Sequence, residues 1–179
     1  MLLRKQHADP ALLTMYEEMI QEAAARIAAI DAQMDALIAM NPRLKQPVEC
    51  LLTMPSIGRL LIINLLVVTE GFTRHVDARE LASYLGICPF PYESGVSVRR
   101  RPQADGAGPA RVRKLLYLAA MRLRTHHPEM RAYYERKTAA GKSGRLVLNN
   151  LANRTLRVMC GLLTAGQPYA PHYHSPKPC

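Results

Sequence analysis

The sequence predicts a mainly α-helical protein that begins with a coiled-coil helix and continues as a helical domain. Apolar residues recur at spacings of three and four along much of the chain, which is the period of a helix packed on one side. Gly, Pro and Asn residues interrupt that pattern where helices would end. One short segment, 96–98, alternates as a strand does, so the sequence is compatible with a single small β-hairpin closed through 102–108.

The first predicted element is a coiled-coil dimerisation helix within residues 1–41. Eight apolar residues form a seam with steps of three and four: Leu13, Tyr16, Ile20, Ala23, Ile27, Ile30, Met34 and Leu37. Four such heptads are typical of a helix that pairs with another copy, so a homodimer or higher homo-oligomer is expected. An amphipathic helix packed on its own domain would show the same pattern. The Asn41–Pro42 step ends the helix, because a residue before proline avoids helical backbone angles.

The second predicted element is a pair of apolar helices around a tight turn, which resembles a helix-hairpin-helix. The helices are expected at 48–54 and 59–70, with Ser56 and Gly58 in the turn. In such a motif the backbone N–H groups that begin the second helix hold a phosphate without reading sequence. A buried αα-hairpin would fit the same residues. Ser56 and Gly58 are therefore candidates for nucleic-acid contact.

The helical domain is expected to span residues 42–165. Its further helices are predicted at 78–85, 110–125, 128–139 and 145–164. Asp77 is a plausible N-cap of the first, with Glu80 at the capping-box position. The helix at 110–125 is basic and amphipathic, and its predicted inward residues are Val112, Leu115, Leu116, Leu118, Ala119 and Met121 or Leu123. Residues 166–179 contain four prolines without periodicity, which predicts a disordered Pro-rich tail.

Net charge is the strongest compositional signal. The chain carries a formal net charge of +10 at pH 7, unevenly spread. Residues 1–40 hold three basic and six acidic side chains, whereas residues 99–157 hold fifteen basic and three acidic ones. So dense a basic field attracts phosphate backbones and releases their counterions on binding. A membrane surface would attract it too, but no Trp- or Phe-rich amphipathic helix accompanies the charge, so nucleic acid is the expected partner.

Cysteine and hydropathy patterns predict a cytoplasmic protein that binds no metal or other cofactor by itself. No apolar stretch reaches the length of a transmembrane helix, and the first residues lack the features of a signal peptide. The four cysteines are scattered without zinc-type spacing. His172 and His174 have no further ligand nearby in the sequence, whereas a zinc site needs three or four.

Residues 86–101, GICPFPYESGVSVRRR, are the candidate site for chemistry. Ser94 stands in a Pro-punctuated loop and is followed by Arg99, Arg100 and Arg101. A hydroxyl that attacks a phosphodiester needs exposure, and it needs cations that hold the phosphate and stabilise the developing negative charge. Ordinary turn chemistry beside a solvated arginine run would give the same residues. The pattern predicts a serine nucleophile at a nucleic-acid backbone, with a structural loop as the alternative.

The order of several motifs resembles one family of DNA recombinases. They are MPSIG at 54–58, ELASYLGICPFPYESG at 80–95, RKLLYLAA at 113–120, Tyr134 and the Gly141–Lys142 pair. In this order they are similar to the C-terminal domain of Piv/MooV-type DNA recombinases and related insertion-sequence transposases. The resemblance covers roughly residues 47–163, and the ASYLGICP…SG block is its specific part.

The resemblance implies a division of labour between two domains. An N-terminal RuvC-like domain with four carboxylates would hold Mg²⁺, so this chain is expected to be an incomplete, C-terminal part. Ser94 matches the serine thought to attack DNA and form a covalent phosphoserine linkage, and some members are guided by a structured RNA. The residues expected to bind nucleic acid are Ser56, Gly58, Arg99, Arg100, Arg101, Arg111, Arg113, Lys114 and Lys142.

Two other functions fit the same sequence. A non-catalytic, dimerising module would grip DNA or guide RNA while another domain cuts, and a pure assembly domain would bind neither. Only Ser94 separates the module from a catalytic domain, because only the chemistry requires its hydroxyl. Tyr133 and Tyr134 could stack on bases in either case, although a Tyr pair in a helix is more often half core and half surface.

Overall fold

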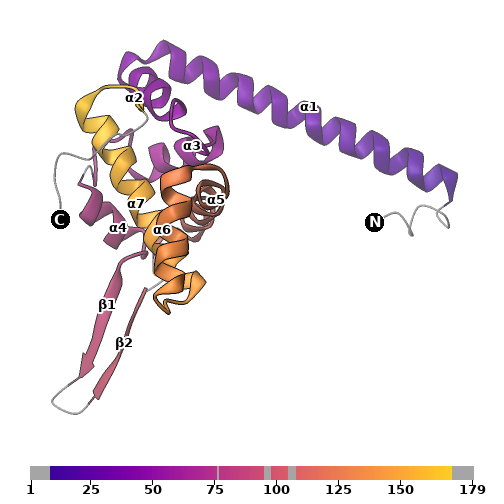
Figure 1. The fold of residues 1–179 in the computed structure, drawn as a ribbon. Coiled ribbons are helices and arrows are strands. Elements are labelled where there is room, and N and C mark those ends of the chain that lie inside the picture. The colour runs from indigo at the N-terminus through magenta and orange to yellow at the C-terminus, as the bar shows by residue number, and fades with distance from the viewer. Residues whose placement is uncertain (1–8, 76, 95–97, 105–107, 171–179) are drawn as a thin grey trace. The chain divides into compact units, whose positions relative to one another are not determined.

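The computed structural model describes residues 9–75, 77–94, 98–104 and 108–170. In chain order, the elements in these ranges are α1 (Pro10–Met40), α2 (Pro42–Leu52), α3 (Arg59–Val68), α4 (Ala78–Tyr84), β1 (Pro89–Ser94), β2 (Val98–Ala104), α5 (Ala110–His126), α6 (Pro128–Ala139) and α7 (Gly144–Ala165) (Figure 1). The predicted mainly α-helical fold class is confirmed. The chain forms two compact units, 1–45 and 46–179, so the division lies four residues beyond the expected boundary.

Helix α1 forms where the apolar seam predicts a helix. The Asp9 carboxylate accepts a hydrogen bond from the Ala11 N–H at 3.0 Å, and Pro10 occupies the first turn, where its missing N–H costs nothing. None of the residues of α1 is buried within the chain. The seam residues Ile20 and Ile27 are 67% and 61% exposed. Pairing of this seam with a second copy stays a prediction.

Helix α2 begins six residues earlier than the sequence predicts. Pro42 opens it, and the side chain of Asn41 accepts a hydrogen bond from the Arg43 N–H at 3.1 Å. The Asn41–Pro42 step therefore ends one helix and starts the next, because proline suits the first position of a helix. After α2 the chain turns through Ser56, which has a left-handed φ of 67°, into α3.

The core of the second unit is built around α7. This helix packs against α4, α5 and α6, and α3 packs against α5. The largest fully buried side chains are Leu51, Ile62, Leu65, Leu85, Val112, Leu116, Leu123, Val147, Leu151, Leu156, Met159 and Leu162. Gly166 ends α7 in the left-handed conformation, where its N–H bonds the Leu162 carbonyl at 2.8 Å.

One face of α5 turns inward, and it is narrower than predicted. Leu116 and Leu123 are buried, whereas Leu118 is 50% exposed and Met121 is 40% exposed. The prediction that Leu118 points inward is wrong. At about 100° per residue it lies roughly 200° around the helix from Leu116, outside the buried face.

The hairpin occupies different residues from those predicted. β1 and β2 are antiparallel, so the chain reverses between residues 94 and 98. Residues 102–104, expected in the closing turn, belong to β2. The ladder is irregular between Phe90 and Tyr92, beside a proline that has no N–H to donate. Among the described elements the two strands pack only on each other.

The described part of the expected tail, 166–170, is held to the helices. The Tyr169 N–H donates to Thr53 Oγ1 at 2.7 Å, and Tyr169 Oη lies 2.9 Å from Nε2 of His127. The Cys50 thiol donates to the Gln167 carbonyl. These contacts contrast with the disorder expected for 166–179, of which 171–179 lie outside the described residues. Of the helices that the structure describes, none combines the length and the apolar character needed to cross a membrane.

Candidate functional site

Ser94 is the last residue of β1 and pairs with Val98, the first residue of β2. The stretch that the sequence predicts as a loop is therefore a strand, and Ser94 lies where the strand meets the reversal of the chain. Residues 95–97, which include Gly95 of the SG motif, lie outside the described residues.

The three consecutive arginines lie on the partner strand, β2. Arg99 is opposite Glu93 and Arg100 is opposite Tyr92. Successive positions of a strand alternate between its two faces. Ser94 and Arg100 therefore occupy positions on one face of the hairpin and Arg99 a position on the other, whereas Arg101 lies where the ladder is irregular.

Arg113 links the two segments that connect the hairpin to the helices, which we call the stems. The first stem is residues 85–88, before β1, and the second contains Gly108, after β2. Nη1 of Arg113 donates hydrogen bonds to the carbonyl of Leu85 at 3.2 Å and to that of Gly108 at 2.6 Å. A charge-assisted bond of this kind contributes about 1.5–3 kcal/mol where it is shielded from water, and less at this half-buried site. The structure thus gives Arg113, predicted to bind nucleic acid, two partners within the protein.

Gly108 lets the stems lie against each other. A Cβ at this position would overlap the carbonyl oxygen of Tyr84 and would lie 2.8 Å from the Leu85 carbonyl carbon. Because both neighbours are backbone atoms, they cannot rotate away as a side chain could. Only glycine permits this approach.

Two asparagines of α7 hold the first stem. Nδ2 of Asn149 and Nδ2 of Asn153 each donate to the carbonyl of Ile87 at 3.0 Å, and so use both lone pairs of that oxygen. The sequence analysis missed these residues. The available signal is a pair of asparagines four residues apart in a long helix, where asparagine is a poor helix former.

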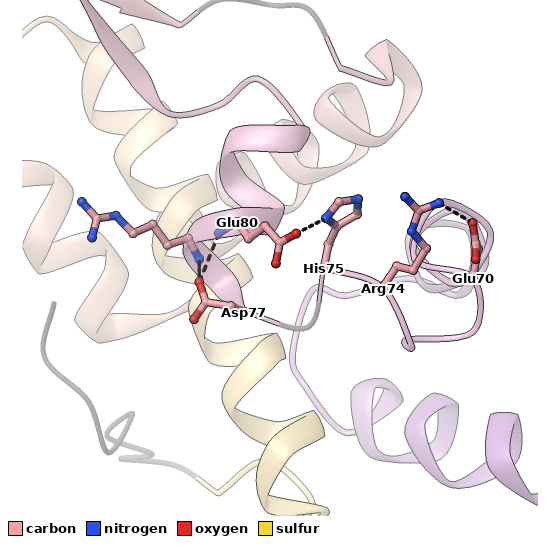
Figure 2. A network of polar contacts seen from close by, with 6 residues as sticks. Glu70, Arg74, His75, Asp77 and Glu80 are labelled. Atoms are coloured by element: carbon pink, nitrogen blue, oxygen red, sulfur yellow. Dashed lines mark hydrogen bonds and ion pairs between the residues drawn. The ribbon is translucent and has the colours of Figure 1, made fainter.

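A polar network fixes the turn that leads into α4 (Figure 2). Asp77 Oδ1 accepts hydrogen bonds from the N–H groups of Arg79 and Glu80, which confirms the predicted cap. The carboxylate of Glu80 lies 2.7 Å from Nδ1 of His75, whose ring stacks on Tyr84. Glu70 and Arg74 form a neighbouring ion pair at 2.7 Å, drawn in Figure 2. The network anchors the helix that precedes the first stem.

The other candidate residues lie on separate elements of the second unit. Arg111 and Lys114 are exposed and three residues apart on α5, and Lys142 is exposed just before the Ser143 cap of α7. No atom outside its immediate chain neighbours lies within 4 Å of a Cβ built on Gly58. The left-handed position of the α2–α3 turn is Ser56 rather than a glycine. Phosphate binding by that turn stays a prediction.

Burial governs the chemistry of two described cysteines, Cys50 and Cys160. Burial, with a smaller contribution from the Asp77 carboxylate, raises the pKa of the Cys160 thiol to about 12. Burial also raises the pKa of Cys50. Both thiols are thus neutral at pH 7 and poor nucleophiles. Within the ranges that the structure covers, no three His, Cys, Asp or Glu side chains gather as metal ligands. His172 and His174 lie outside those ranges.

The chain is similar to proteins of bacterial insertion elements. It is 32% identical to an uncharacterized 43.6 kDa protein of insertion element IS110 from Streptomyces coelicolor over 141 aligned residues. The alignment covers 79% of this chain and 34% of that protein. The chain is 29% identical over 160 residues to an uncharacterized 42 kDa protein of IS900 from Mycobacterium paratuberculosis, covering 86% and 39%.

It is also similar to a pilin gene-inverting protein of Moraxella lacunata, with 25% identity over 149 residues that cover 83% of this chain and 46% of that protein. The chain thus spans less than half the length of these curated relatives. Residues 48–135, from α2 into α6, match the model of the Transposase IS116/IS110/IS902 family.

Proposed function

We propose that this chain is the C-terminal part of a DNA transposase or recombinase, and that Ser94 is its nucleophile. The similarity to insertion-element and pilin gene-inverting proteins supports the class of activity. The observation that carries the assignment of Ser94 is its position at the end of β1, paired with a strand that holds three consecutive arginines.

In the proposed reaction, the Ser94 oxygen forms a bond to the phosphorus of a DNA phosphodiester. The bond from phosphorus to one deoxyribose oxygen breaks, the serine proton passes to a base or to solvent, and the departing oxygen takes up a proton. The phosphoserine bond keeps the energy of the broken linkage available for rejoining to another strand. Guanidinium groups stabilise the negative charge that develops on the phosphoryl oxygens.

Among the three arginines, the strand register favours Arg100 as the phosphate ligand. It lies two positions beyond Val98, the partner of Ser94. Diagonal neighbours of this kind on one face of an antiparallel pair are about 7–8 Å apart, within reach of a long side chain. Arg99, at a position on the opposite face, suits a neighbouring phosphate.

The Mg²⁺ expected from the resemblance does not fit the described residues, because they form no ligand group. Its ligands would have to lie elsewhere in the complete protein. The mechanism proposed for this chain therefore contains no step through the metal. A structured guide RNA is proposed as a second nucleic-acid partner.

We also propose that α1 pairs with a second copy of itself. Six of the eight seam residues are exposed, none is buried, and the seam repeats over four heptads. Burying one Ile or Leu side chain stabilises an assembly by about 1.5–3 kcal/mol, so such a seam offers a substantial driving force. A dimer would carry two Ser94 hairpins, one for each of two DNA strands.

The deciding experiment joins this chain to the upstream domain of an insertion-element relative. Labelled insertion-site DNA, Mg²⁺ and structured RNA are added, and wild type is compared with Ser94→Ala. A protein–DNA adduct that survives denaturation and forms only with wild type would support the proposal. Undiminished cleavage by Ser94→Ala would contradict it and leave a non-catalytic nucleic-acid module as the function. Omitting the RNA tests whether the reaction depends on a guide.

A further inference from the structure

Helices α5, α6 and α7 carry a group of cations arranged around two tyrosine rings, made of residues outside the hairpin. We call it the tyrosine-braced patch, and it consists of Arg124 of α5, Tyr133, Tyr134, Arg136 and Lys137 of α6, and Arg154 of α7. These three helices pack against one another, so the residues come together from separate elements.

Tyr133 is the centre of the patch. The guanidinium carbons of Arg154 and Arg136 lie 5.5 Å and 5.8 Å from the centroid of its ring, and Lys137 Nζ lies at 5.8 Å. All three distances fall within the range of a cation–π interaction, about 6 Å. One half-buried ring on α6 thus holds three positive groups, one of them from α7.

Tyr134 extends the arrangement to α5 and to the start of α7. The guanidinium carbon of Arg124 lies 4.8 Å from its ring centroid. Its hydroxyl approaches Gly144 so closely that a Cβ at Gly144 would lie 2.6 Å from it. Gly144 therefore leaves room for Tyr134, which in turn supports Arg124.

Collecting like charges in this way is costly unless an anion joins them. Positive charges gathered around one ring repel each other, and they do so more strongly at the effective dielectric of a protein surface than in water. An exposed cation–π contact is weak and offsets only part of that repulsion. Residues 124–154 contain seven Lys and Arg against two Glu, so the local field is strongly positive. A polyanion placed on the patch would turn this repulsion into attraction.

The rings also indicate which polyanion suits the patch. Proteins that bind single strands offer aromatic faces on which bases stack. Here cations lie over both rings, so the tyrosines brace the cations rather than offer free stacking platforms. Three of the four cations are arginines, whose planar fork matches phosphate oxygens. These features favour the backbone of a duplex, whose bases remain stacked inside.

We propose that the tyrosine-braced patch binds backbone phosphates of duplex DNA, without reading sequence, at a site separate from the Ser94 hairpin. This inference shares one premise with the proposed function, namely that the chain acts on DNA. It does not require any reaction at Ser94. DNA held there would flank the segment presented to the hairpin.

The test measures the binding of the 179-residue chain to a labelled duplex of random sequence by fluorescence anisotropy over a salt series. Arg136→Gln and Arg154→Gln are each expected to weaken binding and to reduce the slope of log K against log salt by about 0.9, the effect of one phosphate contact. Arg79→Gln on α4, also exposed, removes the same charge outside the patch and is expected to leave the slope unchanged.

A second pair of variants tests the bracing. Tyr133→Phe keeps the ring and is expected to bind as wild type does, whereas Tyr133→Leu removes it and is expected to weaken binding. Thermal melting of each variant shows whether the fold is retained. Ser94→Ala is expected to bind with the wild-type slope, which separates this inference from the proposed chemistry.

The inference is overturned if Arg136→Gln and Arg154→Gln keep the wild-type affinity and slope. It is equally overturned if they lose affinity for a structured RNA while duplex DNA binding is unchanged, because the patch would then belong to RNA. An absence of duplex binding by the wild-type chain at low salt would also reject it.

Discussion

Arg113 on α5 donates a hydrogen bond to the carbonyl of Gly108 at 2.6 Å, and the same nitrogen donates to Leu85. One guanidinium therefore ties together the chain that runs into the hairpin and the chain that leaves it. In sequence the two carbonyls are 23 residues apart. The side chain that joins them belongs to a basic helix, and the sequence alone predicts that this side chain binds nucleic acid.

Arg113→Gln is expected to lower the free energy of unfolding by about 1–2 kcal/mol, because two backbone carbonyls lose their donor. The salt slope of duplex binding is expected to stay at the wild-type value. Denaturant unfolding and the anisotropy titration measure the two quantities. A slope reduced by about 0.9 with unchanged stability would instead identify Arg113 as a phosphate ligand.

Gly108→Ala is expected to destabilise the chain by more than about 2 kcal/mol, since the new Cβ would overlap backbone atoms. Gly58→Ala is the matched control. Gly58 has a φ of −92° and no atom within 4 Å of an added Cβ, so this change is expected to cost only about 0.5–1 kcal/mol, the loss of a favourable N-cap residue. Thermal melting compares the two variants, and equal losses would show that the stems tolerate separation.

Asn149→Ala and Asn153→Ala are each expected to cost about 0.5–1.5 kcal/mol, because the remaining amide still serves the Ile87 carbonyl. The double variant is expected to cost more than the sum of the two, since that carbonyl then loses both donors. A double-mutant cycle from denaturant unfolding measures the coupling. Simple additivity would mean that water replaces the amides without loss.

Arg100→Gln is expected to slow adduct formation about 10²- to 10³-fold, the usual cost of removing one group that stabilises a transition-state charge. Arg99→Gln, at a position on the other face of the strand, is expected to slow it less, and so is Arg101→Gln, where the ladder is irregular. The rate of adduct formation at saturating DNA distinguishes them. An equal or greater effect at Arg99 would reject the assignment based on register.

Ile27→Asp is expected to convert an α1-mediated dimer into a monomer, because a charge in the seam must lose its hydration for the helices to pair. Gln21→Asp, which adds the same charge on the outer face of α1, is expected to leave the assembly intact. Sedimentation equilibrium measures the mass of each. A wild-type chain that is monomeric at high concentration would exclude self-pairing through this helix.

The parts of the fold that depend on local pattern could be predicted from the sequence. The bounds of α6 match the prediction. Helix α5 ends one residue later than predicted, and α7 is one residue longer at each end. Pro42 was interpreted only as the end of a helix, although proline equally suits a helix start. Which face of α5 is buried depends on how it packs against α3 and α7, which the sequence pattern does not specify. The prediction that Leu118 points inward was therefore wrong.

The candidate site was less predictable because its contacts are non-local. The loop predicted around Ser94 is strand β1 instead, and its ladder with β2 is irregular beside Pro91. Composition also gives no means of telling whether an arginine will meet a phosphate or a backbone carbonyl. The partners of Arg113 and Asn153 follow from the packing of α5 and α7 against the stems, which no sequence period encodes.

Because the described strands of the hairpin are attached to the helices only at their base, a small rotation there produces a larger displacement at their far end. Six residues of extended strand span about 20 Å, so a rotation of about 10° at the base would displace the far end by roughly 3.5 Å. Chemistry at phosphorus responds to misplacements of about 1 Å. If Ser94 is the nucleophile, as proposed, the hydrogen bonds at the base set the angular tolerance of its position, although they lie at the opposite end of the strands from it.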